Sequence, residues 1–167
     1  IWDKSDKDAD SIYEAVQPLV SGVGDIIVPN LAMITNELTS SLLLLPGDIR
    51  LSRFEDELAM HWPLCSDGNS RAFRIESAFW RLAQKVAIQN QCQLIYFDLG
   101  PNLGSINRSA LIASDFLVVP LAPDLFSLQG LRNLGPTLRK WRTEWCDRST
   151  KSQSDIPLPQ AKMQPLG

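Results

Sequence analysis

The stretch from Leu94 to Gly104, LIYFDLGPNLG, decides the fold of this chain. Four large apolar residues run without interruption up to Asp98, and a Gly-Pro pair follows one residue later. A short apolar run bounded by turn residues is typical of a strand that is buried on both faces of a sheet. A carboxylate at that point is consistent with a simple turn, and also with a functional group at the end of the strand.

A second run of the same kind, Phe116 to Val119, follows after a segment with helical spacing. Residues 94–119 therefore predict a strand, a helix and a strand, about the size of a compact βαβ crossover. A right-handed crossover brings the C-terminal ends of both strands to one edge of the sheet. We therefore expect Asp98 and the loop 121–126 to face the crevice in which such sheets bind ligands. The apolar residues with helical spacing between the two runs are Leu103, Ile106, Ala110 and Ala113.

The N-terminal part of the chain predicts one further strand and two helices. Ser11 and Glu14 have the spacing of a capping box, which predicts a short helix that ends near Gly22. Leu42 to Leu45 form another continuous apolar run, which we expect to be a strand buried on both faces. The second helix follows this run, and its apolar face consists of Leu51, Phe54, Leu58 and Trp62.

Two longer helices are predicted elsewhere in the chain. One runs from Arg71 to about Gln89. The other runs from Ser127 to Trp145, and Gly135-Pro136 is expected to kink it or to split it in two. Trp141 and Trp145 lie on its apolar stripe, which places them in a core or an interface. Together these elements predict the α/β fold class, with a parallel sheet and helices on both of its faces.

The composition is that of a globular protein of about one domain. The 167 residues are 44% hydrophobic and 21% charged, and the net charge of −3 gives no overall electrostatic argument for nucleic acid binding. Cys65, Cys92 and Cys146 lack the spacing of a metal site, and His61 has no acid–base partner close in the sequence. No apolar run is long enough to cross a bilayer, so we expect a cytoplasmic protein without a membrane segment.

The segments LIYFDLGPNLG, NRSALIASDFLVVPL and APDLFSLQGLRNL together resemble the second half of a ParA/MinD-type ATPase. These bacterial and archaeal proteins form the deviant Walker A class of P-loop ATPases and position plasmids, chromosomes and other cargo. SIYEAV and LLLLPGDIRLSRFEDEL resemble the central region of the family, so the resemblance covers roughly residues 11–145. Two positions depart from the usual pattern: Gly100 replaces the first residue of a Pro-Pro pair, and Ser109 stands where many relatives have asparagine.

The resemblance implies ATP and Mg²⁺ as cofactors. Asp98 would end the strand of a Walker B element, where its carboxylate accepts hydrogen bonds from the waters around Mg²⁺. Gly100 and Pro101 would belong to the switch segment that senses the terminal phosphate. These three residues are therefore the predicted catalytic and metal-orienting part of the site.

The loop after the second predicted strand is the other part of the expected site. By the resemblance, Pro120, Asp124 and Phe126 would flank the nucleotide or the partner in a dimer. Asp124 also has the alternative role of capping the helix that begins near Ser127, because aspartate is a favoured N-cap residue.

The phosphate-binding loop of the family, KGGxGKT/S, is expected to lie before Ile1. The nearest candidate within the chain, Ser21 to Asp25, lacks both the lysine and the serine or threonine of that loop. Asp98 alone cannot hold a nucleotide, because the phosphates need backbone amides and a lysine around them. We therefore expect residues 1–146 to be the middle and later part of an ATPase domain that is inactive by itself. Residues 147–167 are expected to form an exposed loop that leads to a missing final strand.

The expected partners are a second copy of the protein, a ParB-like activator or cargo adaptor, and nonspecific DNA. Relatives bind DNA through basic residues of the C-terminal region, which here contains Arg132, Arg139, Lys140 and Arg142. Such a patch would neutralise phosphates and be sensitive to salt, whereas a solvated helix face would have the same sequence pattern. Two further hypotheses are a MinD-like ATPase that works at the membrane, and a non-catalytic interaction module of the same fold.

Overall fold

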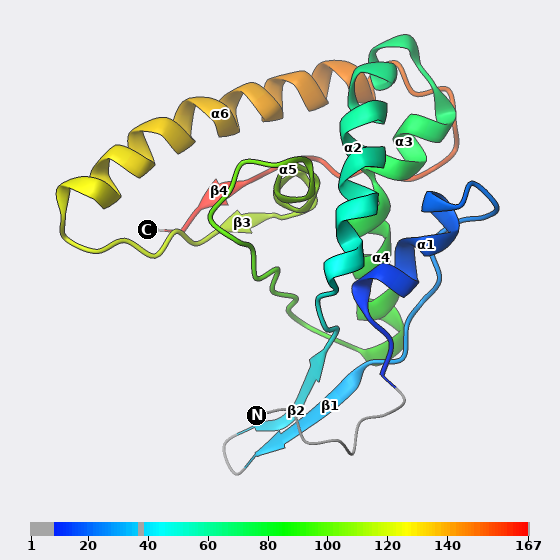
Figure 1. Ribbon diagram of the computed structural model, residues 1–167, viewed down its shortest axis with the longest axis horizontal. Helices are drawn as coiled ribbons and strands as arrows, with labels where there is room; N and C mark the ends of the chain where they lie inside the picture. Colours follow the sequence, from blue (N-terminus) through cyan, green and yellow to red (C-terminus); the bar gives the residue numbers. More distant parts are fainter. Residues whose placement is uncertain (1–8, 37–38, 167) are drawn as a thin grey trace.

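The computed structural model describes residues 9–36 and 39–166 (Figure 1). Its helices are α1 (Ile12–Val20), α2 (Ser52–Leu64), α3 (Ser70–Glu76), α4 (Ala78–Asn90), α5 (Ser105–Ile112) and α6 (Leu125–Ser149). Its strands are β1 (Ala32–Asn36), β2 (Thr39–Leu44), β3 (Phe116–Leu117) and β4 (Gln164–Pro165). Figure 1 shows α1 to α4 gathered at one side, while α6 extends away from them past α5.

The two N-terminal helices form where the sequence predicts them. The N–H of Ser11 donates to Oε2 of Glu14 at 2.6 Å, which is the return half of a capping box, and α1 ends at Val20 with Ser21 as its C-cap. In α2 the residues with helical spacing, Phe54, Leu58 and Trp62, are buried. Local spacing was sufficient here because each helix needs only one apolar face toward a core.

The long helix predicted from residue 71 to residue 89 is interrupted at Ser77, which separates α3 from α4. Ser77 has a ψ of 1°, and its hydroxyl donates to the carbonyl of Phe73 at 2.6 Å. A hydroxyl that bonds the backbone one turn earlier disturbs the helix at that point. By contrast, α6 runs continuously through Pro136, so the split is wrong, and the kink, which was the other alternative, stays a prediction. Arg132, whose carbonyl loses its helical partner to the proline, is exposed, so water can satisfy that carbonyl.

The run Leu42 to Leu45 differs from its prediction. Its first residues belong to β2, which pairs antiparallel with β1 in a hairpin that projects away from the helices (Figure 1). Leu42 is 48% exposed, so the strand is not buried on both faces. A strand is buried on both faces only when helices or a second sheet cover both of them, and the described residues provide no such cover for this hairpin.

The segment 94–99 is extended, but it is not a strand within the part of the chain that the structure describes. Leu94 is 65% and Tyr96 80% exposed, whereas Phe97 and Leu99 pack against a core. The prediction of a strand buried on both faces is therefore wrong for this chain as folded. Among the described residues no neighbouring strand pairs with the segment. It is therefore not part of a sheet with helices on both faces, and only the side with Phe97 and Leu99 packs against a core.

Of the second predicted run, Phe116 to Val119, only the first two residues form a strand, β3. It pairs in parallel with β4 through Phe116 with Gln164 and Leu117 with Pro165. Parallel pairing is therefore present, as the α/β class requires, although the sheet is small. The residues that lead into β4 are not an exposed loop throughout, since Ala161 and Met163 are buried. The division of the chain at residue 146 remains a prediction.

Two apolar cores hold the helices together. The first lies between α1, α2, α4 and α5, and includes Leu19, Phe54, Leu58, Phe79 and Ala110. The second lies between α2, α3, α5 and α6, and includes Trp62, Phe73, Ile112, Trp141 and Trp145. The indole N–H of Trp145 donates to the carbonyl of Pro159 at 2.8 Å, which ties the C-terminal segment to α6. The prediction of a core role for both tryptophans is confirmed.

Candidate functional site

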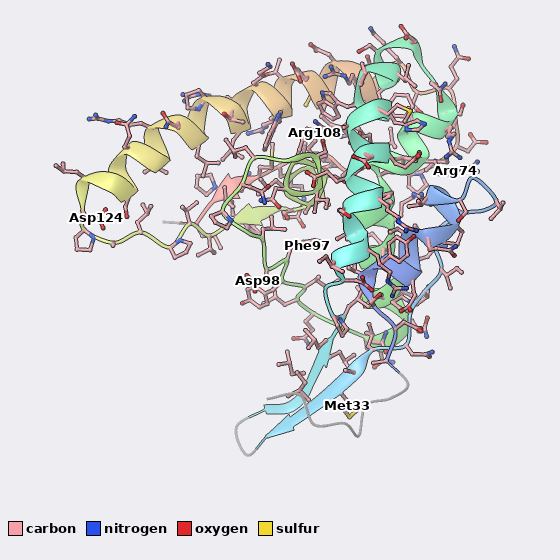
Figure 2. All side chains as sticks on the ribbon, in the orientation of Figure 1. Met33, Arg74, Phe97, Asp98, Arg108 and Asp124 are labelled. Atoms are coloured by element: carbon pink, nitrogen blue, oxygen red, sulfur yellow. The ribbon has the colours of Figure 1, made fainter. Side chains whose placement is uncertain are left out.

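Asp98 lies at the end of the extended segment, with its side chain directed away from the core side of that segment (Figure 2). Phe97, the residue before it, packs toward the first core, and the alternation along an extended chain turns the next side chain outward. Asp98 is exposed and makes no hydrogen bond or ion pair within residues 9–36 and 39–166. The carboxylate is thus accessible from solvent, as a group that interacts with a hydrated ion would need to be.

The loop that follows Asp98 is fastened to α5 by Asn107. The side-chain amide of Asn107 donates to the carbonyl of Gly100 at 2.6 Å and to the carbonyl of Asn102 at 2.7 Å. The N–H of Gly104 donates to Oδ1 of Asn102 at 2.9 Å, which closes the turn into the helix. Asn107 itself is buried. Gly100 and Pro101, the predicted switch residues, therefore lie in a loop of defined conformation.

The start of α5 is also held by Glu55 of α2. Oε1 of Glu55 accepts a hydrogen bond from the N–H of Ser105 at 2.9 Å, so a carboxylate lies at the positive end of the helix. A Cβ on Gly104 would clash with this oxygen and would lie 3.0 Å from Oδ1 of Asn102. A side chain at position 104 would therefore displace the end of the Glu55 side chain from the N–H of Ser105, although the backbone angles of Gly104 are ordinary.

Asp124 caps α6, as the alternative interpretation of that residue predicted. Its Oδ1 accepts a hydrogen bond from the N–H of Ser127 at 2.6 Å, and the helix begins at Leu125. An open, mostly apolar pocket of about 460 Å³ lies at this end of the helix, lined by Leu121, Ala122, Pro123, Asp124, Leu125, Ser127 and Leu131. Pro120 precedes the pocket and is exposed, and the side chain of Phe126 lies outside the described residues.

The structure does not bring the two halves of the predicted site together. No residue of the Asp98 loop lines the pocket beside Asp124. In Figure 2, Asp124 lies at the outer end of α6, well away from Asp98. The catalytic, metal and nucleotide roles of these residues therefore remain predictions.

A buried polar cluster connects α5 to three other helices. Arg108, next to Asn107, donates to the carbonyl of Leu58 at 3.1 Å and lies 3.4 Å from Oε1 of Glu76. The guanidinium groups of Arg108 and Arg148 lie 4.2 and 4.3 Å from the ring centre of Trp62. The indole N–H of Trp62 donates to Oε2 of Glu144 on α6 at 3.2 Å.

Burial dominates the electrostatics of this cluster. It raises the pKa of Glu76 to about 8, although Arg108 and Arg148 both favour the charged carboxylate. It also lowers the pKa of Arg108. Among the described residues, Oε2 of Glu76 has no hydrogen-bond partner. The environment of Glu76 therefore favours the neutral, protonated carboxyl group over the charged carboxylate.

Sequence reasoning did not identify Asn107, Glu55, Arg108 or Glu76. The only local signal was for Asn107, because an asparagine in the first turns of a helix often bonds nearby backbone. Glu55 and Ser105 are 50 positions apart, and Glu76 and Arg108 are 32 apart, so no local pattern connects them.

The predicted basic residues share one exposed side of α6. Arg132, Arg139, Lys140 and Arg142 are all exposed, while Trp141 and Trp145 face the second core. Lys140 lies 3.9 Å from Glu144, which is too long for a strong ion pair. The helix thus presents cations to solvent along much of its length.

The described residues contain no cluster of three or more histidine, cysteine, aspartate or glutamate side chains that could hold a metal ion. In the same residues, no helix combines the length and the apolar character needed to span a membrane.

The chain is similar to known proteins in sequence and in structure. A family model described as AAA domain matches residues 4–151. A curated relative, the virulence plasmid ParA family protein pGP5-D of Chlamydia psittaci, is 40% identical over 47 residues, which cover 28% of this chain and 18% of the relative. The crystal structure of protein DIP2308 from Corynebacterium diphtheriae matches with a TM-score of 0.75 and 29% identity, over 86% of this chain and 45% of that protein.

The structural match confirms the α/β, P-loop-like fold class. The chain spans less than half the length of each of these two proteins. Because the family match takes in most of the chain and the curated relative is a ParA family protein, the chain belongs to the ParA-type family of P-loop ATPases.

Proposed function

We propose that this chain is part of an ATP-dependent switch of the partitioning type, in which Asp98 orients the hydration shell of Mg²⁺. The observation that supports this role most directly is the accessible, unpaired carboxylate of Asp98 at the end of an extended apolar segment. A single carboxylate fits Mg²⁺, because this ion keeps several of its waters and needs only one or two protein ligands. When bound, the ion would neutralise charge on the phosphates.

The loop after Asp98 is the proposed switch segment. Gly100 and Pro101 lie in a turn whose carbonyls are held by Asn107, so a displacement of α5 would be transmitted directly to this backbone. The 167 residues contain no glycine-rich segment followed by lysine and serine or threonine, so an active site of this kind would need a phosphate-binding loop from outside them. ATP hydrolysis is accordingly proposed for the whole protein.

The second proposed contact is the pocket at the start of α6. Its apolar lining suits the flat face of a base or an apolar side chain of a dimer partner. Asp124 lines the pocket, Pro120 precedes it in the loop, and Phe126 belongs to the first turn of α6. The carboxylate of Asp124 is already engaged as a helix cap, so its contribution would be to hold the loop in shape.

The role of Asp98 is tested by ATP hydrolysis in the full-length gene product. Asp98→Ala is expected to lower kcat by at least about 100-fold, because the Mg²⁺ shell would lose its protein acceptor. Asp155→Ala is a suitable control, since Asp155 is an exposed carboxylate on the C-terminal segment. Hydrolysis that survives Asp98→Ala would contradict the assignment.

The exposed cations of α6 support nonspecific DNA binding as a second part of the proposal. All four are exposed on a long helix, whose Trp141 and Trp145 are buried in the second core. Phosphate contacts of this kind release counterions, so the affinity should fall steeply with salt. Arg139→Ala is expected to weaken binding and to reduce the salt slope by about 1. Binding that is unchanged between low and high salt would count against this patch.

Dimerisation, an activator or cargo adaptor, and a cytoplasmic location belong to the same proposal and rest on the family. A non-catalytic interaction module of this fold is the second candidate, because the 167 residues lack a phosphate-binding loop. A full-length protein that binds no ATP and yet retains a binding partner would favour that candidate.

A further inference from the structure

We infer that Asn107 is a positioning residue: its side-chain amide sets the backbone of the loop 100–104, and thereby the direction in which this loop presents its groups beside Asp98. The inference rests on the proposed function for its catalytic consequence. Its structural part can be tested without any activity.

The two donors of one amide account for most of the order in this loop. Nδ2 of Asn107 donates to the carbonyls of Gly100 and Asn102 at 2.6 and 2.7 Å, and an asparagine amide has two N–H groups to give. In the described parts of the chain, no hydrogen bond between backbone groups holds residues 99–103. The conformation of the loop therefore depends on side chains, and the buried amide of Asn107 supplies two of the bonds.

The direction of these carbonyls fixes the direction of the neighbouring amides. None of the described peptide bonds is cis, so the N–H of Leu103 points opposite to the carbonyl of Asn102. That carbonyl points at Asn107, so the N–H of Leu103 is turned away from α5. Pro101 has no N–H, so the carbonyl of Gly100 can point inward without turning a backbone donor outward. The amide of Asn107 thus selects which backbone donor this loop presents.

A separate anchor allows this effect to be isolated. The N–H of Gly104 bonds to Oδ1 of Asn102, inside the turn that Asn107 holds. The N–H of Ser105 bonds instead to Glu55 of α2, which does not involve Asn107. Exchange at the Gly104 amide therefore depends on the turn that Asn107 holds, whereas exchange at the neighbouring Ser105 amide depends on Glu55.

The structural test is amide hydrogen exchange, followed by NMR, on the chain and on Asn107→Ala. We expect the Gly104 amide to exchange at least about tenfold faster, while the amides of Ser105 and Ile112 stay within about twofold. Asn90→Ala is the matched control, because Asn90 also donates its side-chain amide to a backbone carbonyl but lies at the end of α4. Unchanged exchange at Gly104, or an equal increase at all three amides, would overturn the inference.

If Asn107→Ala does not fold, Asn107→Asp provides the same test with nearly the same shape. An ionised aspartate has no donor and faces two carbonyl oxygens, whereas a protonated one recovers one donor. Exchange at Gly104, after correction for the intrinsic pH dependence, should therefore be faster above the pKa of the new carboxyl than below it. A corrected rate that does not depend on pH would refute the positioning role.

The catalytic consequence is tested in the full-length protein by steady-state ATP hydrolysis. Asn107→Ala is expected to lower kcat by about tenfold and to leave KM within about twofold, since a displaced loop affects the reacting geometry more than binding. A change in KM alone would refute this consequence. If the unmodified protein does not hydrolyse ATP, the proposed function fails, while the exchange experiment still decides whether Asn107 positions the loop.

Discussion

The buried carboxyl of Glu76 makes the stability of this protein depend on pH in an unusual direction. Glu76 lies beneath Arg108 of α5, with Arg148 of α6 and Cys65 also close enough to interact with it. Burial raises the pKa of Glu76 from 4.5 to about 8. The unfolded chain therefore loses this proton at a lower pH than the folded protein does.

The sign follows from proton binding. Between pH 4.5 and about 8 the folded state holds the Glu76 proton and the unfolded state does not, so the free energy of unfolding falls as the pH rises. At about 1.4 kcal/mol per pH unit where the proton numbers differ by one, and less near pH 8 where the folded state also loses the proton, the contribution lost between pH 5 and pH 8 is about 3 to 4 kcal/mol. For most buried carboxylates that are well paired, the free energy of unfolding rises with pH instead, because pairing lowers their pKa in the folded state.

The assay is urea denaturation of the chain and of Glu76→Gln at pH 5, 6, 7 and 8. Glutamine imitates the protonated carboxyl and cannot lose a proton, so the variant should lack the fall that the unmodified chain shows. All other titratable groups are shared by the two proteins, and the difference between them isolates Glu76. Equal pH dependence of the two proteins would refute the buried, neutral state of this group.

Three further predictions concern single contacts. Gly104→Ala should lower the free energy of unfolding by about 1 to 2 kcal/mol in urea denaturation, because the new Cβ displaces Glu55 from Ser105; an unchanged value would mean that this cap contributes nothing. Trp145→Ala should lower it by about 3 to 5 kcal/mol in the same measurement, since the side chain is fully buried; a loss below about 1 kcal/mol would contradict its place in the second core. Asp124→Ala should reduce the helical circular dichroism signal through fraying at the start of α6, with a loss of about 1 kcal/mol, whereas a signal like that of the unmodified chain would argue against the cap.

The sequence was informative wherever a structure depends on near neighbours. The capping residues of α1 and the buried face of α2 followed from residues three or four positions apart. Asp124 was recognised as a possible cap for the same reason. The break at Ser77 was missed, because it arises from a hydroxyl that bonds the backbone one turn earlier and does not alter the apolar spacing.

The strands show where local patterns fail. An apolar run such as 94–99 predicts that its side chains are more stable when buried, but it does not predict which strand will pair with it. The run at Leu42 found an antiparallel neighbour, the run at Phe116 found a short parallel one, and the run at Leu94 has no paired strand among the described residues. Strand pairing depends on how the whole chain folds. For this reason the family resemblance predicted the fold class better than it predicted the burial of each strand.

The amino-acid sequence by itself determined the family, the helical faces and the position of Asp98 at the end of an extended apolar segment. The tertiary structure alone decided that Asn107 holds the loop after Asp98, that Glu55 caps α5 and that Glu76 lies buried beside Arg108. The physical reason is the range of the interactions. Most helix caps and apolar faces are set within one or two turns of chain, whereas a buried polar contact between helices or a cap from another helix exists only after distant segments have packed together.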